Sequence, residues 1–170
     1  GHKVALKARP RGAAGEDRRL RREFERLRTL RLPNVVRVLD TGADQGYVFY
    51  TMDVVVGAQL DDYIQQAPDL QGRVQRAVHT AADVARALVG IHKRKRAHRD
   101  IKSANIIVST SGQVTVLDFG TARFSEGGED SAMMGTATTM APEQRLGMQQ
   151  DHRVDLYALG ATLHQALWPD

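Results

Sequence analysis

Two short apolar runs around a Ser-Gly pair constrain the fold of this chain more than any other feature. Ile106–Val108 and residues 114–117 are rich in β-branched side chains and flank Ser111-Gly112. Such a pattern predicts an antiparallel hairpin closed by a two-residue turn. Counting outward from that turn, Asn105 would face Asp118 at the open end of the hairpin.

The open end of this hairpin is expected to gather oxygen-bearing side chains. The amide of Asn105 and the carboxylate of Asp118 would lie side by side, and Asp100 and Lys102 stand just upstream, in the loop that leads into the first strand. Mg²⁺ prefers carboxylate, amide and phosphate oxygens as ligands. The sequence therefore predicts a magnesium site beside a space of phosphate size.

The rest of the chain divides into a strand-rich part and a mainly helical part. We expect one domain over residues 1–53 and a second over residues 54–170, with a hinge near residues 53–57. Hydrophobic periodicity and turn residues set the expected elements. The predicted strands are 2–8, 35–39 and 47–53, with turns over 10–15 and around Gly42 and Gly46, and the predicted helices are 16–30, 59–66, 73–92 and 154–168.

Apolar residues recur at helical spacing in two of these segments. They are Leu20, Phe24, Leu27 and Leu30 in the first helix, and Val74, Val78, Ala81, Ala85 and Leu88 in the long one. At about 100° per residue, Glu23 lies within about 60° of Leu20, Leu27 and Leu30, whereas Glu25 is on nearly the opposite face. An inward carboxylate is costly unless a cation pairs with it. The alternative is that Glu23 is an edge carboxylate among neighbouring arginines.

Composition excludes several classes of protein. The 170 residues include no cysteine, which excludes disulfides, iron–sulfur clusters and thiolate zinc sites. The apolar stretches fall far short of the roughly 20 residues that cross a bilayer, so we expect no membrane segment in this chain. The net charge of +4 is concentrated in two basic runs, within 18–31 and at 93–96. Because only Phe24 interleaves with them, we interpret them as solvated helix faces and expect no nucleic-acid partner; the alternative is a basic RNA-binding protein.

Several motifs occur in an order that is typical of one family. His98-Arg99-Asp100-Ile101-Lys102-Ser103-Ala104-Asn105, followed by Asp118-Phe119-Gly120, resembles the catalytic core of a protein kinase. Val4-Ala5-Leu6-Lys7 resembles the third strand of that family, Ala141-Pro142-Glu143 its substrate-side motif, and residues 155–160 the helix start beneath the catalytic loop. The chain thus resembles a eukaryotic-like (bacterial-type) serine/threonine protein kinase catalytic domain. The resemblance implies an α+β, two-lobed protein-kinase-like fold.

The same resemblance implies ATP and Mg²⁺ as cofactors and gives each polar residue a role. Asp100 would orient the acceptor hydroxyl and receive its proton, and Lys102 would neutralise charge on the transferred phosphoryl group. Asn105 and Asp118 would hold Mg²⁺, and Lys7 would hold the α- and β-phosphates.

The resemblance also implies residues that support the nucleotide. Glu23, rather than Glu25, would pair with Lys7. The adenine would lie against Ala5, Met52, the hinge backbone at Asp53 and Val55, and an apolar floor at Ile107. Composition alone would equally explain Met52, Val55 and Ile107 as ordinary core packing.

The substrate class follows from the Asp100-x-Lys102 spacing, which resembles that of serine/threonine kinases, with Thr136 downstream to frame the acceptor. The expected partner is a protein with a Ser or Thr acceptor. Small-molecule phosphotransferases share the Asp and Asn residues but lack Ala141-Pro142-Glu143. Arg99 suggests control by phosphorylation within residues 121–139, with Ser131 the first candidate among Ser125, Ser131, Thr136, Thr138 and Thr139; a polar loop without such a role is the alternative.

Both ends of the chain depart from the family pattern. Only Gly1-His2-Lys3 precede the strand of Lys7, and the chain ends at Trp168-Pro169-Asp170. We therefore expect incomplete lobes, without the first two strands, the Gly-rich loop or the arginine that pairs with Glu143. A noncatalytic kinase-like interaction module or an inactive fragment is the alternative function. The expected location is cytoplasmic, and the resemblance to bacterial transmembrane-linked kinases would place any membrane anchor beyond Asp170.

Overall fold

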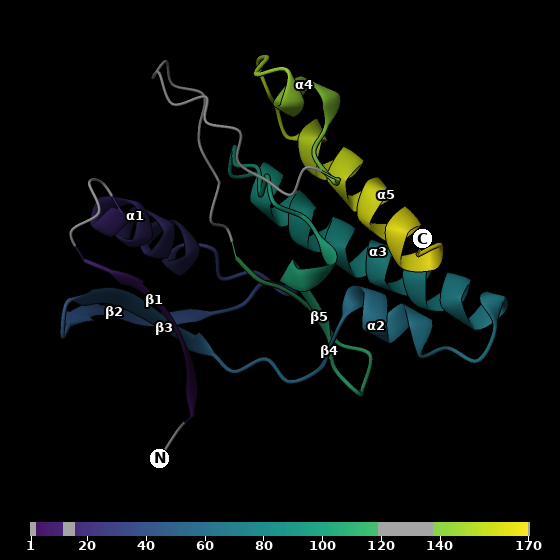
Figure 1. The fold of residues 1–170 in the computed structure, drawn as a ribbon, viewed down its shortest axis with the longest axis horizontal. Helices are drawn as coiled ribbons and strands as arrows, with labels where there is room; N and C mark the ends of the chain where they lie inside the picture. Colours follow the sequence, from purple (N-terminus) through teal and green to yellow (C-terminus); the bar gives the residue numbers. More distant parts are fainter. Residues whose placement is uncertain (1–2, 12–15, 119–137, 170) are drawn as a thin grey trace.

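The computed structural model describes residues 3–11, 16–118 and 138–169. Its first part is a three-stranded antiparallel sheet covered by one helix (Figure 1). The strands β1 (Val4–Pro10), β2 (Val38–Asp44) and β3 (Tyr47–Asp53) lie in the order β1-β3-β2, and α1 (Glu16–Arg28) follows β1 in the chain. The predicted stripe of α1 is confirmed, because Leu20, Phe24, Leu27 and Leu30 are all buried.

The second part is mainly helical and contains a second small sheet. Its strands lie in the order β4-β5-β6, and α3 and α5 run side by side along this part of the molecule (Figure 1). The elements are β4 (Ala58–Gln59), α2 (Leu60–Gln65), α3 (Leu70–His92), the 3₁₀ turn η1 (Ser103–Asn105), β5 (Ile106–Val108), β6 (Val114–Val116), α4 (Pro142–Arg145) and α5 (Arg153–Leu167). The expected α+β kinase-like fold is therefore present.

A short stretch after α1 ties the two parts together. Val35 forms an isolated parallel bridge with Val116, and the Val116 amide donates to the Asn34 carbonyl at 2.7 Å. Buried residues of α1, β3, α3 and both strands of the hairpin belong to one apolar core. This bridge places the end of β6 close to the first sheet.

The second strand and its turn were predicted wrongly. Residues 35–39 were expected to form the strand, but β2 begins at Val38 and runs to Asp44, so Gly42 lies inside a strand. The turn falls on Gln45 and Gly46, with φ angles of 44° and 78°. Two consecutive left-handed residues suit a tight hairpin turn, and Gly46 alone therefore marked the turn correctly. Pro10, expected in a turn, ends edge strand β1, where its missing N–H does no harm.

The long helix begins earlier than predicted and buries a different face. Val74 and Val78 are 40% and 64% exposed, contrary to the expected stripe, whereas Ala77, Val84 and Leu88 are buried. Because α3 is rich in small apolar residues, two neighbouring stripes have similar helical spacing. Contacts with α2, α5 and β6 select the buried one. The ends of α1 and α3 also differ from prediction, by two and three residues.

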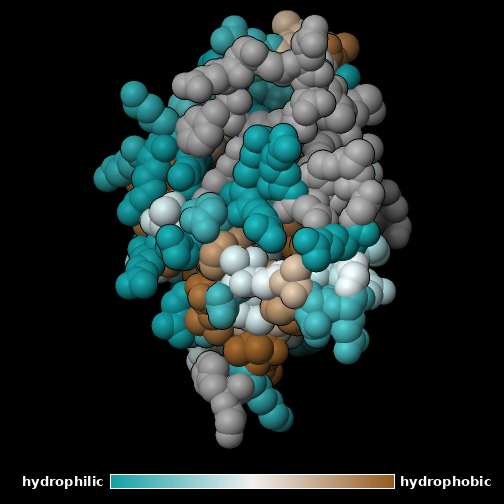
Figure 2. All heavy atoms as spheres, turned by 90° about the vertical axis from the view of Figure 1, so that its left-hand side faces the viewer, coloured by the Kyte–Doolittle hydropathy of each residue, from teal (hydrophilic) through white to brown (hydrophobic). Residues whose placement is uncertain are grey.

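The first sheet presents its two faces to different surroundings. Val4, Leu6 and Tyr47 are exposed, and Figure 2, which views this side of the molecule, shows apolar surface at its lower end. Side chains alternate along a strand, so Ala5 and Lys7 point to the opposite face, towards α1. Within the described ranges, the chain has no helix that is both long and apolar enough to cross a bilayer.

Candidate active site

Lys7 of β1 lies between two carboxylates that come from distant parts of the chain. Its Nζ is 2.8 Å from Glu23 Oε1 on α1 and 2.7 Å from Asp118 Oδ1, just after β6. Burial alone would lower the pKa of Lys7, but the two carboxylates outweigh burial and raise that pKa above its ordinary value. Lys7 is therefore a fixed positive charge at neutral pH.

Helical geometry correctly identified the partner of Lys7. Glu23 is only 6% exposed and sits among the buried apolar residues of α1. It accepts a second hydrogen bond on the same oxygen, because the Tyr50 hydroxyl donates to Glu23 Oε1 at 2.8 Å. The alternative of an edge carboxylate among arginines does not hold.

Asp100, Lys102 and Asn105 form a second polar group in the loop before β5. Asp100 Oδ2 is 3.0 Å from Lys102 Nζ and accepts a hydrogen bond from Asn105 Nδ2 at 3.0 Å. Asn105 Nδ2 also donates to the Asp100 carbonyl, at 2.8 Å. Asp100 Oδ1 is buried and accepts no hydrogen bond within the described part of the chain. A buried acceptor without a donor is costly, so this oxygen is ready to accept a proton or hydrogen bond from a bound molecule.

A buried aspartate on α5 holds the loop that presents Asp100. Asp155 accepts backbone hydrogen bonds from His98 at 2.8 Å and Arg99 at 2.7 Å, and its Oδ2 lies 2.8 Å from His92 Nε2. The backbone φ of Arg99 is 64°, a left-handed conformation that residues other than glycine rarely adopt. Such local strain persists only where the surroundings enforce it, and Asp155 provides that restraint.

His98 anchors the same loop on its other side. It is fully buried, its Nε2 lies 2.9 Å from the Leu117 carbonyl, and its Nδ1 accepts from the Asp100 amide at 3.3 Å. Burial lowers the pKa of His98 below its ordinary value. A neutral imidazole therefore links the loop that carries Asp100 to the end of the hairpin.

The predicted register of the hairpin is wrong by one residue. Ile106 pairs with Val116 and the Leu117 amide donates to the Asn105 carbonyl, so Asn105 faces Leu117 and not Asp118. The cause is a three-residue loop that ends at Gly112, whose φ of 81° is left-handed. Asp118 lies one position further, where its own φ of 46° turns the chain and its carboxylate contacts Lys7.

The expected adenine-binding residues come from the first sheet, from the segment after β3 and from β5 of the second sheet. Ala5 and Met52 are cross-strand partners, and Ala5, Met52, Val55 and Ile107 are all half-buried. Ile107 points away from its buried neighbours in β5, whereas Met52 packs partly against the core. Asp53 uses its carboxylate for a two-point contact with Arg37, at 2.9 and 3.1 Å, so only its backbone could face a nucleotide.

The donor atoms near the hairpin end suit a hard cation. Asn105 is buried and donates through its amide nitrogen, which leaves its carbonyl oxygen as the group that could bind a metal. Asp118 has a second carboxylate oxygen besides the one on Lys7. No cluster of three or more His, Cys, Asp or Glu occurs within the described residues. Mg²⁺ usually completes its shell with water and phosphate oxygens, so two protein ligands of this kind fit a magnesium–nucleotide complex.

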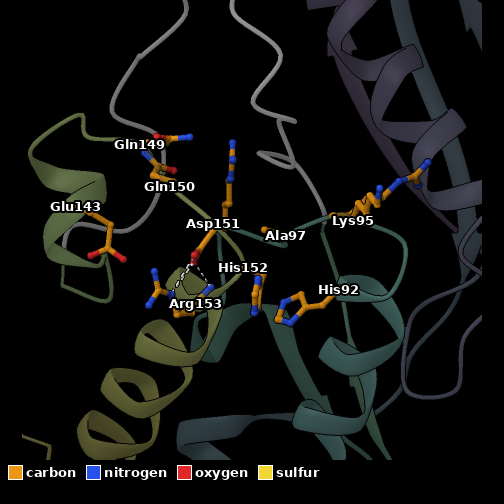
Figure 3. A pocket seen from close by; sticks show the side chains of 11 residues that line it. His92, Lys95, Ala97, Glu143, Gln149, Gln150, Asp151, His152 and Arg153 are labelled. Carbon is orange, nitrogen blue, oxygen red and sulfur yellow. Dashed lines mark hydrogen bonds and ion pairs between the residues drawn. The ribbon is translucent and has the colours of Figure 1, made fainter.

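A separate pocket is lined by the end of α3, the segment before Asp100 and the start of α5 (Figure 3). Its volume is about 620 Å³, and Glu143, His152 and Arg153 line it together with part of the loop before Asp100. Asp151 points towards Arg153, and the Arg153 amide, more than the side chain, lowers the pKa of Asp151. None of Lys7, Asp100, Asn105 or Asp118 lines this pocket, so it is distinct from the predicted site.

Sequence patterns did not reveal two residues of the candidate site, Tyr50 and Asp155. Tyr50 looks like an ordinary strand residue. Asp155 begins the segment 155–160 that resembles a helix start of the family, but that resemblance gave Asp155 no role of its own. Their contacts bridge 27 and more than 50 residues, so local patterns could not reveal them. Phe119, Gly120, Ser125, Ser131 and Thr136 lie outside the described residues; Thr138 is exposed and Thr139 is buried.

Comparison with known proteins gives a consistent result. The family model described as "Protein kinase domain" matches residues 1–169. The chain is similar to a probable serine/threonine-protein kinase of Clostridium perfringens, with 37% identity over 87% of this chain and 22% of the relative. It is also similar to serine/threonine-protein kinase PknB of Mycobacterium leprae (35% identity, 88% of this chain and 25% of the relative) and to serine/threonine-protein kinase pkn3 of Myxococcus xanthus (37%, 88% and 29%). The chain spans about a quarter of the length of these curated relatives.

Proposed function

This chain belongs to the protein kinase family, as a domain of the bacterial serine/threonine type, and on that premise we propose that it transfers the γ-phosphoryl group of Mg-ATP to Ser or Thr hydroxyls of a protein substrate. One observation carries the proposal: Lys7 bridges the Glu23 and Asp118 carboxylates at 2.8 and 2.7 Å, across strand, helix and hairpin. A half-buried cation held in this way is suited to nucleotide phosphates.

The nucleotide would lie between the two sheets. Lys7 would contact the α- and β-phosphates, while Asn105 and Asp118 would hold Mg²⁺, which neutralises phosphate charge during transfer. The half-buried side chains of Ala5, Met52, Val55 and Ile107 and the backbone at Asp53 would surround the adenine. Glu23 would keep Lys7 in place while Asp118 holds the metal.

Asp100 would act on the acceptor. Asp100 Oδ1 has no hydrogen-bond donor among the residues that the structure describes, and a Ser or Thr hydroxyl donating to it would be aligned with the γ-phosphorus. The acceptor oxygen forms a bond to phosphorus, the bond from phosphorus to the β,γ-bridging oxygen breaks, and the hydroxyl proton passes to Asp100. Lys102, 3.0 Å from Asp100 Oδ2, would balance the charge on the transferred group. ADP and the phosphorylated protein are the products.

A noncatalytic interaction module would not need the arrangement of Asp100, Lys7 and Glu23. A scaffold gains nothing from an acceptor at Asp100 that has no donor within the described residues. It also gains nothing from a half-buried Lys7 paired with the buried Glu23, because apolar residues of similar size are often as stable. These features support the catalytic proposal over the alternative.

Label transfer from γ-labelled ATP tests the proposal. With Mg²⁺ and a generic basic protein substrate, Asp100→Asn should lower kcat by about 10²- to 10⁴-fold, the usual range for a positioned base. Asp44→Asn, the same change at an exposed position of β2, should leave kcat unchanged. Equal labelling by the wild type and the Asp100 variant would contradict the proposal.

A further inference from the structure

A tyrosine on β3 completes the Lys7–Glu23 pair. Tyr50 is fully buried, and its hydroxyl donates to Glu23 Oε1 at 2.8 Å, the oxygen that also contacts Lys7 Nζ. Lys7 and Tyr50 are direct cross-strand partners in the β1–β3 ladder. Both side chains therefore leave the same face of the sheet and meet Glu23 from neighbouring strands.

The ring of Tyr50 contributes to the same cluster. Lys7 Nζ lies 5.8 Å from the centre of the Tyr50 ring, within the range of a cation–π contact. On the other side, the Phe24 ring lies 6.2 Å away, at a tilt of 40°. Phe24 is next to Glu23 on α1, so the tyrosine contacts both the apolar and the acidic part of that helix turn.

We propose that Tyr50 is a positioning residue for phosphoryl transfer, which holds Glu23, and through it Lys7, in the geometry that binds the nucleotide phosphates. The inference rests on the proposed kinase function and adds a residue to it. It concerns a hydrogen bond between β3 and α1, so the same contact also fixes the helix against the sheet.

The hydroxyl is suited to this task because it cannot become a competing anion. Burial, with the Glu23 carboxylate beside it, raises the pKa of Tyr50 far above its ordinary value. The group thus remains a neutral donor. A lysine or arginine at this position would add a second cation and compete with Lys7 for Glu23, whereas tyrosine satisfies the carboxylate without changing the net charge.

The contact becomes most important when the metal binds. Asp118 would then bind Mg²⁺ as well as Lys7, and Glu23 would be the remaining carboxylate that holds Lys7 alone. A carboxylate held by one donor can rotate, whereas one held by Lys7 and Tyr50 from two strands cannot do so without breaking a buried hydrogen bond. Loss of the hydroxyl should therefore affect ATP more than the protein substrate.

Tyr50→Phe in the full chain tests this inference, because it removes one oxygen and keeps the ring. We expect kcat/KM for ATP to fall about 10- to 100-fold, the range for a hydrogen bond to a charged group, with KM for the protein substrate unchanged. Tyr47→Phe, at an exposed position of the same strand, is the matched control and should behave as wild type.

A double-mutant cycle with Glu23→Gln separates positioning from stability. If Tyr50 acts through Glu23, Tyr50→Phe should change kcat/KM for ATP by less than about threefold in the Glu23→Gln background. The same cycle is read by urea unfolding. Coupling in the unfolding constant without coupling in kcat/KM would show a structural role only and overturn the inference, as would additive effects in both.

The two failures are distinguishable. If the wild-type protein transfers no label, the proposed function fails, and the positioning role fails with it. If the wild type transfers label and Tyr50→Phe retains its kcat/KM for ATP, only the role of Tyr50 is overturned.

Discussion

Replacing Asp155 with asparagine should both destabilise the protein and disable its catalytic loop. The carboxylate is fully buried and accepts from the His98 and Arg99 amides at 2.8 and 2.7 Å, with His92 Nε2 also 2.8 Å away. Asparagine has one acceptor oxygen, so its amide nitrogen would face a donor.

The size of this effect follows from the bonds lost. Hydrogen bonds to a charged group contribute about 1.5–3 kcal/mol each, and an unsatisfied buried donor costs a similar amount. With one of the two backbone hydrogen bonds kept and the other lost, we expect the free energy of unfolding to fall by about 3 kcal/mol, a large part of the roughly 5–15 kcal/mol of a typical domain. Release of the left-handed Arg99 would also displace Asp100. Since a shift of about 1 Å in a reacting group can cost about 100-fold, kcat should fall at least that much.

Urea unfolding and label transfer on the same samples measure both effects. Circular dichroism follows the helices, and the single tryptophan, Trp168, reports on the end of α5. Asp151→Asn is the matched control, because Asp151 is an exposed partner of Arg153 only four residues earlier. An Asp155→Asn protein as stable and as active as the control would refute the argument that this carboxylate holds the loop.

Other changes test different parts of the structure. Lys7→Met should lower the free energy of unfolding by about 3–5 kcal/mol, because it leaves the buried Glu23 carboxylate without its cation; adding Glu23→Gln should restore part of the loss, and no recovery in urea unfolding would argue against the pair. Burial lowers the pKa of His98, so below about pH 6.5 the unfolded chain binds a proton that the folded chain does not. Stability should therefore decline as the pH falls from about 6.5 through the folded pKa, a trend that a pH series of urea melts would detect and that should be weaker in His98→Gln. Gly57→Ala would place a Cβ 2.3 Å from the Val108 carbonyl oxygen, and overpacking of this kind costs about 1–3 kcal/mol; an unchanged melting temperature would contradict it.

Local sequence patterns predicted the parts of the site that depend on local geometry. The spacing of Leu20, Leu27 and Leu30 determined which face of α1 is buried and therefore selected Glu23 over Glu25. Tyr47–Asp53 was predicted with the bounds that the structure shows. In each case the sequence pattern that led to the prediction spans only a few residues.

The remaining features of the site could not be predicted, because they depend on contacts between distant segments and on the geometry of the hairpin loop. The hairpin loop has three residues instead of two, which shifts the register by one residue. Every residue of the first strand then faces a different partner from the expected one, so the expected pairing of Asn105 with Asp118 was wrong. Asp118 contacts Lys7 because of its own backbone turn. The roles of Tyr50 and Asp155 depend on contacts with α1 and the catalytic loop, which no periodicity in β3 or α5 encodes.

We propose that a Ser or Thr hydroxyl at Asp100 receives the phosphoryl group from a nucleotide held at Lys7. Phosphoamino-acid analysis of protein labelled from γ-labelled ATP and Mg²⁺ tests it most directly. We expect labelled phosphoserine and phosphothreonine with the wild-type protein, and almost no labelled phosphoamino acid with Asp100→Asn or Lys7→Met. Phosphotyrosine as the main product, or equal label from the variants, would contradict it.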